Sequence, residues 1–448
     1  MRKILIANRG EIALRIIKTC HLMGIETVAV YSDADKEMPF VKKAAHAFSI
    51  GEAPVNQSYL KMDTILEIAK KEGVDAIHPG YGFLSENADF AKAVHKAGIS
   101  FIGPSPDTIE LMGDKIVSRR TMMEAGVPVV PGSEEGTSTL EEACRLAELI
   151  GYPVMLKASG GGGGIGMIRC ENEQALAKSF GSTKARAKAY FGSEEVFVEK
   201  YIENARHIEV QIFGDDYGNN VHLYERDCSI QRRHQKVVEE SPSPFLTEEC
   251  KGKMYETALK AASAVNYKNA GTIEFIVDEQ ENFYFLEMNT RLQVEHPVTE
   301  QITGLDLVEW QILVARGDKL PLLQNEISRS GHAIEFRLYA EDPKSFLPSP
   351  GKIEVFQWHA IKGVRVDSGY DSASTVTPFY DPMIAKCIIY SETRDEAIRK
   401  ASKFFAELEL KGINTNAPLF KEILMDSDFK SGNYTTSFLL NKTFSVNI

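Results

Sequence analysis

Cysteine is sparse in this chain and follows no pattern. The six cysteines lie at positions 20, 144, 170, 228, 250 and 387 of 448 residues, with no CxxC pair and no spacing typical of a metal site. A disulfide framework is therefore not expected, and the thiols fit a reducing cytosol. A chain of this length can bury the cores of roughly two to four domains, so it does not need such cross-links.

An excess of positive charge is also missing. Lysine and arginine number 51 against 63 aspartates and glutamates, a net charge of −12, which disfavours a nucleic-acid-binding or anionic-membrane surface. No apolar run approaches transmembrane length. The opening residues, MRKILIANRGEIALRI, have neither the apolar core nor the cleavage site of a signal peptide. With 43% hydrophobic and 25% charged residues, the chain is predicted to be a soluble cytoplasmic α/β protein.

The N-terminal part of the chain alternates strand-like and helical patterns. Apolar runs at 3–7 and 27–31 flank a helical stripe over 11–23, and further strand-like runs lie at 76–78 and 100–102. This alternation predicts an α/β domain over residues 1–114 with a doubly wound parallel sheet. The first turn lacks GxGxxG, so a dinucleotide is not expected there.

Three further segments are predicted. Residues 115–130 form a helical linker that ends in a proline-punctuated break. Residues 131–202 form a small α/β unit with strands at 154–158 and 195–199, separated by a glycine run and a helix. From 203 to 448, period-two alternation predicts antiparallel strands, as at 333–338.

A hairpin with facing carboxylates is predicted between residues 271 and 300. Runs of strand composition at 272–277 and 283–288 flank a polar connection. This register places Glu274 opposite Glu287, where two carboxylates repel unless a cation lies between them. Asn289 lies on the same face, and the three oxygen donors suit Mg²⁺.

The alternative is that both glutamates lie on a solvated sheet face. The residues that follow the hairpin favour a site instead. Arg291, Gln293 and Glu295 come directly after the carboxylates, and they supply an anion-binding fork and a potential base within a few residues.

A glycine run follows the strand at 154–158. Its sequence, KASGGGGGIG over 157–166, lets several backbone N–H groups approach a polyphosphate, and Lys157 can add a charge. It is not a Walker A loop, because the lysine precedes the glycines. A flexible linker is the alternative, but the position inside a compact unit favours a mobile lid over nucleotide phosphates.

Two other polar segments are expected to be solvated unless a ligand covers them. His207, Glu209 and Gln211 alternate with apolar residues and predict a solvated sheet face. The segment QRRHQK over 231–236 predicts a solvated basic turn or an anion site.

Together these motifs resemble one family. The lysine and glycine lid, EKYI at 199–202 and the E…ExNxR pattern resemble an ATP-grasp ligase. Longer segments resemble biotin carboxylase: ANRGEIA, HPGYGFLSEN, KASGGGGG, ERDCSIQRRHQKVVEE, EMNTRLQVEHPVTE and FRLYAEDP. The resemblance spans nearly the whole chain, up to PFYDPMIAK at 378–386. It implies an ATP-grasp fold with a doubly wound N-terminal domain, a small glycine-lid domain and an antiparallel C-terminal domain.

The resemblance also implies roles for individual residues. ATP would be held by Lys115, Lys157, Gly163, Gly164, Met167, Glu199, Lys200, Ile202, His207, Gln231, His234, Ile276 and Glu287. One or two Mg²⁺ or Mn²⁺ ions would be held by Glu274, Glu287 and Asn289. Bicarbonate would be held by Lys236, Arg291, Gln293, Val294 and Glu295, and biotin would lie near Tyr81, Gly82, Gln231 and Arg337. Glu295 would be the base and Arg337 would stabilise the biotin enolate, while Lys236 and Arg291 complete the catalytic set.

The implied reaction is ATP- and bicarbonate-dependent carboxylation of biotin through carboxyphosphate, the first half-reaction of an acyl-CoA carboxylase. No AMKM-like biotinyl-lysine motif is present, so biotin is expected on a separate biotin carboxyl carrier protein, with separate carboxyltransferase subunits. Acetyl-CoA carboxylase is the leading expectation. A homodimer is implied, although Lys18 and Leu22 replace a basic–acidic interface pair of some bacterial members. Ile165 replaces a basic lid residue.

Three alternatives stay open at this point. The holoenzyme could carboxylate propionyl-CoA or methylcrotonyl-CoA. Another ATP-grasp ligase that uses an acyl phosphate is disfavoured by HPGYGFLSEN and RRHQKVVEE. A catalytically silent ATP-binding regulatory subunit is disfavoured because the implied catalytic and phosphate-binding residues are all retained, namely Lys157, Lys236, Glu274, Glu287, Arg291, Glu295 and Arg337.

Overall fold

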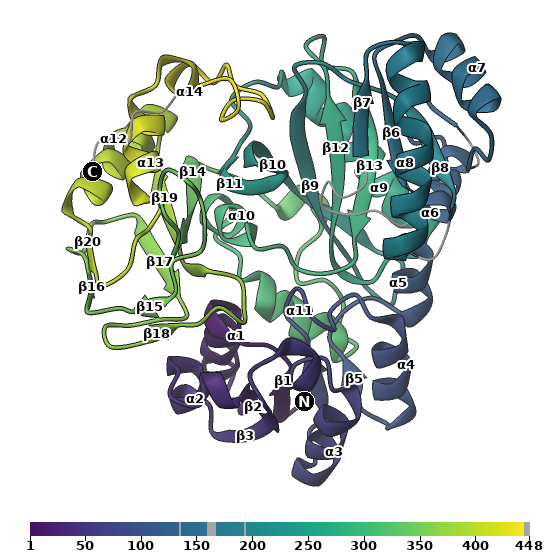
Figure 1. Ribbon diagram of the computed structural model, residues 1–448. Coiled ribbons are helices and arrows are strands. Elements are labelled where there is room, and N and C mark those ends of the chain that lie inside the picture. The colour runs from purple at the N-terminus through teal and green to yellow at the C-terminus, as the bar shows by residue number, and fades with distance from the viewer. Residues whose placement is uncertain (134–135, 159–166, 192–193, 443–448) are drawn as a thin grey trace.

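The protein is organised around three main β-sheets. A computed structural model describes residues 1–133, 136–158, 167–191 and 194–442. Figure 1 shows the N-terminal sheet (purple) at the base and a large sheet at the centre. A smaller sheet lies on one side of the large sheet, and the C-terminal helices (yellow) lie on the other side. No helix in the described ranges combines the length and apolarity needed to cross a membrane. All six cysteines are free.

The N-terminal sheet is doubly wound, as predicted. Its strands are β1 (Lys3–Ile6), β2 (Glu26–Ser32), β3 (His46–Gly51), β4 (Ala76–His78) and β5 (Ser100–Phe101), all parallel in the order β3-β2-β1-β4-β5. The accompanying helices are α1 (Gly10–Leu22), α2 (Pro39–Lys43), α3 (Met62–Glu72), α4 (Ala88–Lys96) and α5 (Pro106–Gly113), with single 3-10 turns at Asp33–Asp35 and Val55–Gln57. The chain order reverses between β1 and β4, where ligand sites of such sheets form.

The loop after β4 is fixed at that switch point. Asn8 Nδ2 donates to the carbonyls of Pro79 (2.7 Å) and Tyr81 (2.8 Å). At the far end of the loop, the Asn87 side chain accepts from the Phe90 backbone N–H and caps α4. The aromatic and glycine-rich segment is therefore fastened at both ends.

The small unit contains an antiparallel sheet. Its strands β6 (Val154–Ala158), β7 (Met167–Cys170) and β8 (Val196–Lys200) are ordered β7-β6-β8. Helices α6 (Lys115–Glu124), α7 (Leu140–Ile150) and α8 (Glu173–Phe191) belong to this part of the chain. Strand β7 was not predicted, because four residues after a glycine run carry little periodic signal. Gly163, Gly164 and Ile165 lie outside the described residues.

The large sheet has eight strands. They are β9 (Arg206–Gly214), β10 (Asn220–Arg232), β11 (Gln235–Ser241), β12 (Asn269–Val277), β13 (Phe283–Asn289), β14 (His332–Tyr339), β17 (Val364–Ser368) and β19 (Met383–Ser391), in the order β13-β12-β9-β10-β11-β14-β19-β17. The predicted hairpin register is confirmed: Glu274 pairs with Glu287, and Thr272 pairs with Asn289. Every pairing in this sheet is antiparallel.

Helices and short sheets complete the C-terminal part. The helices are α9 (Glu248–Ala264), α10 (His296–Thr303), α11 (Leu307–Ala315), α12 (Arg394–Glu407), α13 (Ala417–Met425) and α14 (Ser427–Ser431), with a 3-10 turn at Gln324–Glu326. Two-stranded sheets join β15 (Gly351–Lys352) to β18 (Thr375–Val376) and β16 (Val355–Gln357) to β20 (Glu409–Lys411). The domain boundaries after residues 114, 130 and 202 stay predictions.

A buried carboxylate ties the C-terminal helices to the large sheet. Glu240 of β11 contacts His332 Nε2 (2.5 Å), Arg394 Nε (2.6 Å) and the Tyr434 hydroxyl (2.6 Å). Burial alone would raise the pKa of Glu240, but Arg394 and His332 outweigh it and lower the pKa to about 2. The ionised carboxylate therefore holds three elements together at neutral pH.

Candidate active site

One face of β9 carries buried polar side chains. His207, Glu209 and Gln211 are 8%, 0% and 0% exposed, so the prediction of a solvated face was wrong. The reason is tertiary: Arg226 of β10 inserts between these polar groups and also donates to Thr299 of α10, a helix that packs on the neighbouring strands β10 and β11. Arg226 donates to Glu209 Oε1 (2.5 Å) and Gln211 Oε1 (2.8 Å).

Lys236 of β11 lies among three carboxylates. Its Nζ donates to Glu209 Oε2 (2.6 Å), Glu274 Oε1 (2.8 Å) and Glu295 Oε1 (2.6 Å). Burial alone would lower the lysine pKa, but the three carboxylates outweigh it and raise the pKa well above its ordinary value. Lys236 is therefore a permanent cation at the centre of the cluster.

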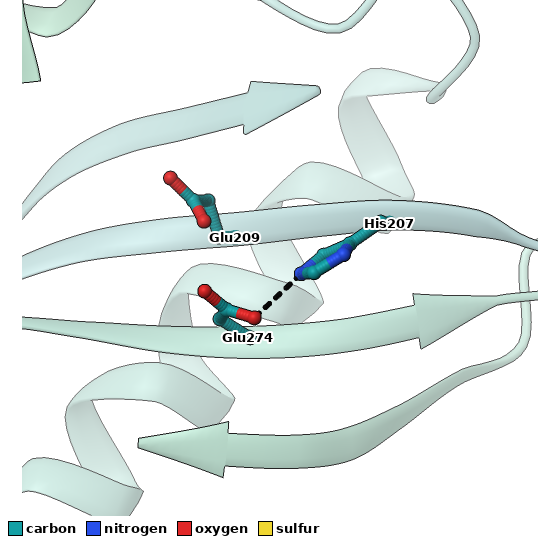
Figure 2. A group of neighbouring side chains, drawn as sticks. All are labelled: His207, Glu209 and Glu274. Carbon is teal, nitrogen blue, oxygen red and sulfur yellow. Dashed lines mark hydrogen bonds and ion pairs between the residues drawn. The ribbon is translucent and has the colours of Figure 1, made fainter. Parts of the chain in front are cut away.

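Figure 2 shows His207 and Glu209 on β9 and Glu274 on the adjacent β12, with His207 and Glu274 in contact. The ligand atoms of these three residues lie within 4.8 Å of one another, close enough to hold a metal ion. The Lys236 ammonium, however, already bridges Glu209 and Glu274. In this structure the group is therefore an ion-paired cluster.

Glu295 links two cations. It is the residue before α10, its side chain is fully buried, and its Oε2 accepts from Arg337 Nη2 (2.9 Å) while its Oε1 accepts from Lys236. Burial alone would raise the pKa of Glu295, but Lys236 and Arg337 outweigh it and hold the pKa below its usual range. In this arrangement Glu295 is ionised and only weakly basic.

The end of the hairpin supplies the anion-binding fork. Arg291 Nη2 donates to Asn289 Oδ1 (2.8 Å), Nη1 to Gln293 Oε1 (3.0 Å) and Nε to Glu86 Oε2 (2.7 Å). The Asn289 and Gln293 amides in turn donate to Glu274 Oε1 at 2.9 and 3.0 Å. The guanidinium is thereby fixed beside the lysine cluster.

Glu287 differs from its neighbours because its carboxylate has no hydrogen-bond partner among the described residues. Burial and the charge of the facing Glu274 raise its pKa, and Lys115 opposes them. An uncompensated carboxylate opposite another carboxylate fits a divalent cation. The Asn289 oxygen accepts from Arg291, and its second lone pair is available to the ion.

The predicted ATP residues of the small unit form contacts of their own. Lys157 pairs with Glu199, and Lys200 Nζ donates to the Gly151 (2.9 Å) and Tyr152 (3.2 Å) carbonyls. Burial alone would raise the Glu199 pKa, but Lys157, Arg119 and Lys115 outweigh it and lower the pKa. Three other predicted ATP residues lie near these strands. Met167 of β7 pairs with Lys157 of β6, and Ile276 of β12 pairs with His207 of β9. Ile202 is half-buried between β8 and β9.

Three predicted residues lie around the turn between β10 and β11. Gln231 Nε2 lies 2.7 Å from His207 Nδ1 and pairs across the strands with Lys236. His234 is exposed with φ 65°, and no hydrogen bond joins it to the cluster among the described residues. The prediction of a solvated turn is thus confirmed for His234 at the tip. It is wrong at the base, where Gln231 is buried and Lys236 belongs to the cluster.

Tyr81 and Val294 meet at Lys386 of β19. Lys386 Nζ donates to the Val294 carbonyl (2.8 Å) and lies 5.7 Å from the centre of the Tyr81 ring. Lys386 also pairs in register with Arg337, which places Tyr81 near the cluster. The Tyr81 hydroxyl is buried and lacks a partner in the described ranges, while Gly82 beside it is exposed with φ 68°.

Several residues of the cluster were not predicted as functional. They are Glu86, Glu209, Arg226, Glu239, Glu335 and Lys386. Alternation placed Glu209 on one strand face and Glu335 beside Arg337 on another, but nothing local indicates which strands become neighbours. Arg226, an arginine that becomes buried between polar strand faces, was the feature that could have revealed this cluster.

Three protein-family profiles match the chain. They are "Biotin carboxylase, N-terminal domain" over residues 1–109, "Carbamoyl-phosphate synthase L chain, ATP binding domain" over 114–323 and "Biotin carboxylase C-terminal domain" over 335–441. The curated protein Biotin carboxylase 2 of Bacillus subtilis (strain 168) is 59% identical over 437 residues, which is 98% of each chain.

Two of the matching solved structures illustrate the shared fold. The biotin carboxylase–beta-gamma-ATP complex from Campylobacter jejuni has a TM-score of 0.96 at 47% identity, covering 98% of this chain and 99% of that one. The biotin carboxylase domain dimer of Hydrogenobacter thermophilus 2-oxoglutarate carboxylase, solved with MgADP, ADP and bicarbonate, has a TM-score of 0.94 at 47% identity, covering 98% and 97%. The chain belongs to the biotin carboxylase family, ATP-dependent ligases with the ATP-grasp fold.

Proposed function

We propose that this chain carboxylates biotin on a separate carrier protein, from ATP and bicarbonate through carboxyphosphate, in the first half-reaction of an acyl-CoA carboxylase. The observation that carries the proposal is Glu295, which contacts Lys236 and Arg337 at once. One carboxylate thus links Lys236, the cation suited to bind bicarbonate, with Arg337, the cation suited to bind the biotin oxyanion.

Proton transfer follows from this shared contact. Glu295 is a weak base while both cations contact it, because they stabilise its ionised form. Bicarbonate bound by Lys236, Arg291, Gln293 and the Val294 backbone would draw Lys236 away and raise the basicity of Glu295. Glu295 can then take the bicarbonate proton as that anion attacks the γ-phosphoryl group of ATP.

Arg337 acts in the second step. Carboxyphosphate collapses to CO₂ and phosphate, and phosphate removes the N1′ proton of biotin. Arg337 then binds the oxyanion that develops on the ureido carbonyl, while Tyr81, Gly82 and Gln231 border the ring. The buried, preorganised guanidinium suits this role because it pays no reorganisation cost.

ATP would lie between the small unit and the large sheet. Lys115, Lys157, Met167, Glu199, Lys200, Ile202, His207, Gln231, His234 and Ile276 would surround it, together with Gly163 and Gly164. Glu274 and Glu287, with Asn289, would hold Mg²⁺ or Mn²⁺, which when bound neutralises charge on the phosphate oxygens. Lys157 would leave Glu199 to meet the phosphates.

Acetyl-CoA carboxylase is the proposed holoenzyme. The acceptor is chosen outside this chain. The biotin carboxylase domain of a 2-oxoglutarate carboxylase and the Campylobacter jejuni biotin carboxylase are equally similar to it, at 47% identity in both cases. A biotin carboxyl carrier protein, carboxyltransferase subunits and a second copy of this chain are the proposed partners, in the cytoplasm.

We expect bicarbonate-dependent ATP hydrolysis that free biotin stimulates and that chelation of Mg²⁺ abolishes. ATP turnover would be measured with and without bicarbonate, biotin and chelator. A folded preparation that binds ATP but gains no turnover from biotin would contradict the proposed function and favour a silent ATP-binding subunit.

A further inference from the structure

Two buried glutamates face each other beside the cluster. Glu239 of β11 pairs in register with Glu335 of β14, and both side chains are 0% exposed. None of their four carboxylate oxygens accepts a hydrogen bond from the described residues. Glu239 Oε1 lies 2.5 Å from Arg337 Nη2 in an ion pair without hydrogen-bond geometry. Residues directly opposed across strands have Cβ atoms about 5 Å apart, so two ionised carboxylates here would repel strongly.

The cations nearby are already engaged. Lys236 contacts three other carboxylates, and Lys386 Nζ donates to the Val294 carbonyl and lies 3.1 Å from Glu11. The charged and titratable groups that act on the pair are Lys236, Cys228, Arg337, Tyr339, Lys386, Cys387 and Glu295. Lys386 is the main cation acting on Glu335, but it also contacts Glu11 and the Val294 carbonyl, so a proton on Glu335 best compensates the pair.

We propose that Glu239 and Glu335 share one proton, carried by Glu335, and that ionised Glu239 is a positioning residue that holds Arg337 beside Glu295. The proposal rests on the role proposed above for Arg337. When Glu295 takes the bicarbonate proton, it becomes neutral and its attraction for Arg337 weakens. Glu239 keeps its charge and retains the guanidinium for the biotin oxyanion, while the proton of the pair stays in place.

The direction of the pKa shifts agrees with this geometry. Burial and Glu295 raise the pKa of Glu239 to about 7 against the opposing charge of Arg337. Burial raises the pKa of Glu335 well above its ordinary value, and Lys386 only partly opposes it. Glu239, which faces Arg337, is therefore the member of the pair that ionises first, while Glu335 keeps the proton.

Infrared spectroscopy of the folded full chain tests the shared proton without relying on activity. At neutral pH the wild-type protein should show the carbonyl stretch of a protonated buried carboxyl that Glu335→Gln removes. Glu256→Gln, on the exposed face of α9, should retain it. An unchanged band in folded Glu335→Gln would overturn the proposal even if the enzyme carboxylates biotin.

Kinetics test the positioning role. Glu239→Gln should lower kcat/KM for biotin on the order of tenfold, the loss of one charge-assisted contact, with a smaller effect on ATP hydrolysis without biotin. Glu335→Gln mimics the protonated carboxyl and should stay within about twofold of wild type. Equal losses of kcat/KM in Glu239→Gln and Glu335→Gln would mean that the pair has only a structural role. Equal losses of ATP hydrolysis with and without biotin would mean the same.

Discussion

Replacing Glu295 with alanine should lower bicarbonate-dependent turnover about 10²–10³-fold while ATP binding persists. The reason is the position of Glu295, whose carboxylate oxygens contact the Lys236 ammonium and the Arg337 guanidinium. Truncation removes the base and lets the two cations separate, but it leaves the small unit and its Lys157–Glu199 pair intact. Steady-state ATP hydrolysis and nucleotide titration measure the two effects separately.

The matched control is Glu256→Ala, which truncates an exposed glutamate. It should match wild type in both assays. If Glu295→Ala instead lost ATP binding, Glu295 would belong to the nucleotide site and its role as base would be wrong.

Replacing Lys236 with alanine should lower the free energy of unfolding by about 3–5 kcal/mol at pH 7, the cost of removing one partner of a buried ion-paired group. Glu209, Glu274 and Glu295 would then face one another without their shared ammonium. Turnover should fall with stability, because bicarbonate loses a binding cation. Urea unfolding measures the stability change.

The stability loss has a defined pH dependence. Lys236 lowers the pKa values of Glu274 and Glu295 from 4.5, so their stabilising contribution is present above about pH 4.5 and is lost as pH falls through the depressed values. The gap between wild type and Lys236→Ala should therefore narrow below that pH. Lys362→Ala, at an exposed position, should have no effect. Equal stability of Lys236→Ala and wild type at pH 7 would mean that the cluster is hydrated.

The hairpin was predictable from the sequence because the residues that determine it lie close together in the chain. Two strand-like runs joined by a short polar connection fix their own register, and Glu274 therefore faces Glu287 as predicted. The doubly wound N-terminal sheet was predictable for a related reason, since alternating strands and helices have few ways to pack.

The burial of the β9 face could not be predicted locally. His207, Glu209 and Gln211 have the alternation of a half-exposed strand. Their burial depends on Arg226 of the neighbouring strand, which joins Glu209 and Gln211 to Thr299 of α10. The Glu239 and Glu335 pair depends likewise on β11 and β14 being neighbours, almost a hundred residues apart in the chain. Long-range strand pairing leaves no local signal.

Transfer of label from bicarbonate to biotin is the most direct test of the claim that this protein carboxylates biotin. The protein would be incubated with ATP, Mg²⁺, isotopically labelled bicarbonate and biotin, free or on a carrier protein. We predict ATP-dependent label on the biotin ureido ring, lost in Glu295→Ala. Steady ATP hydrolysis by the wild-type protein with no label on biotin would contradict this claim.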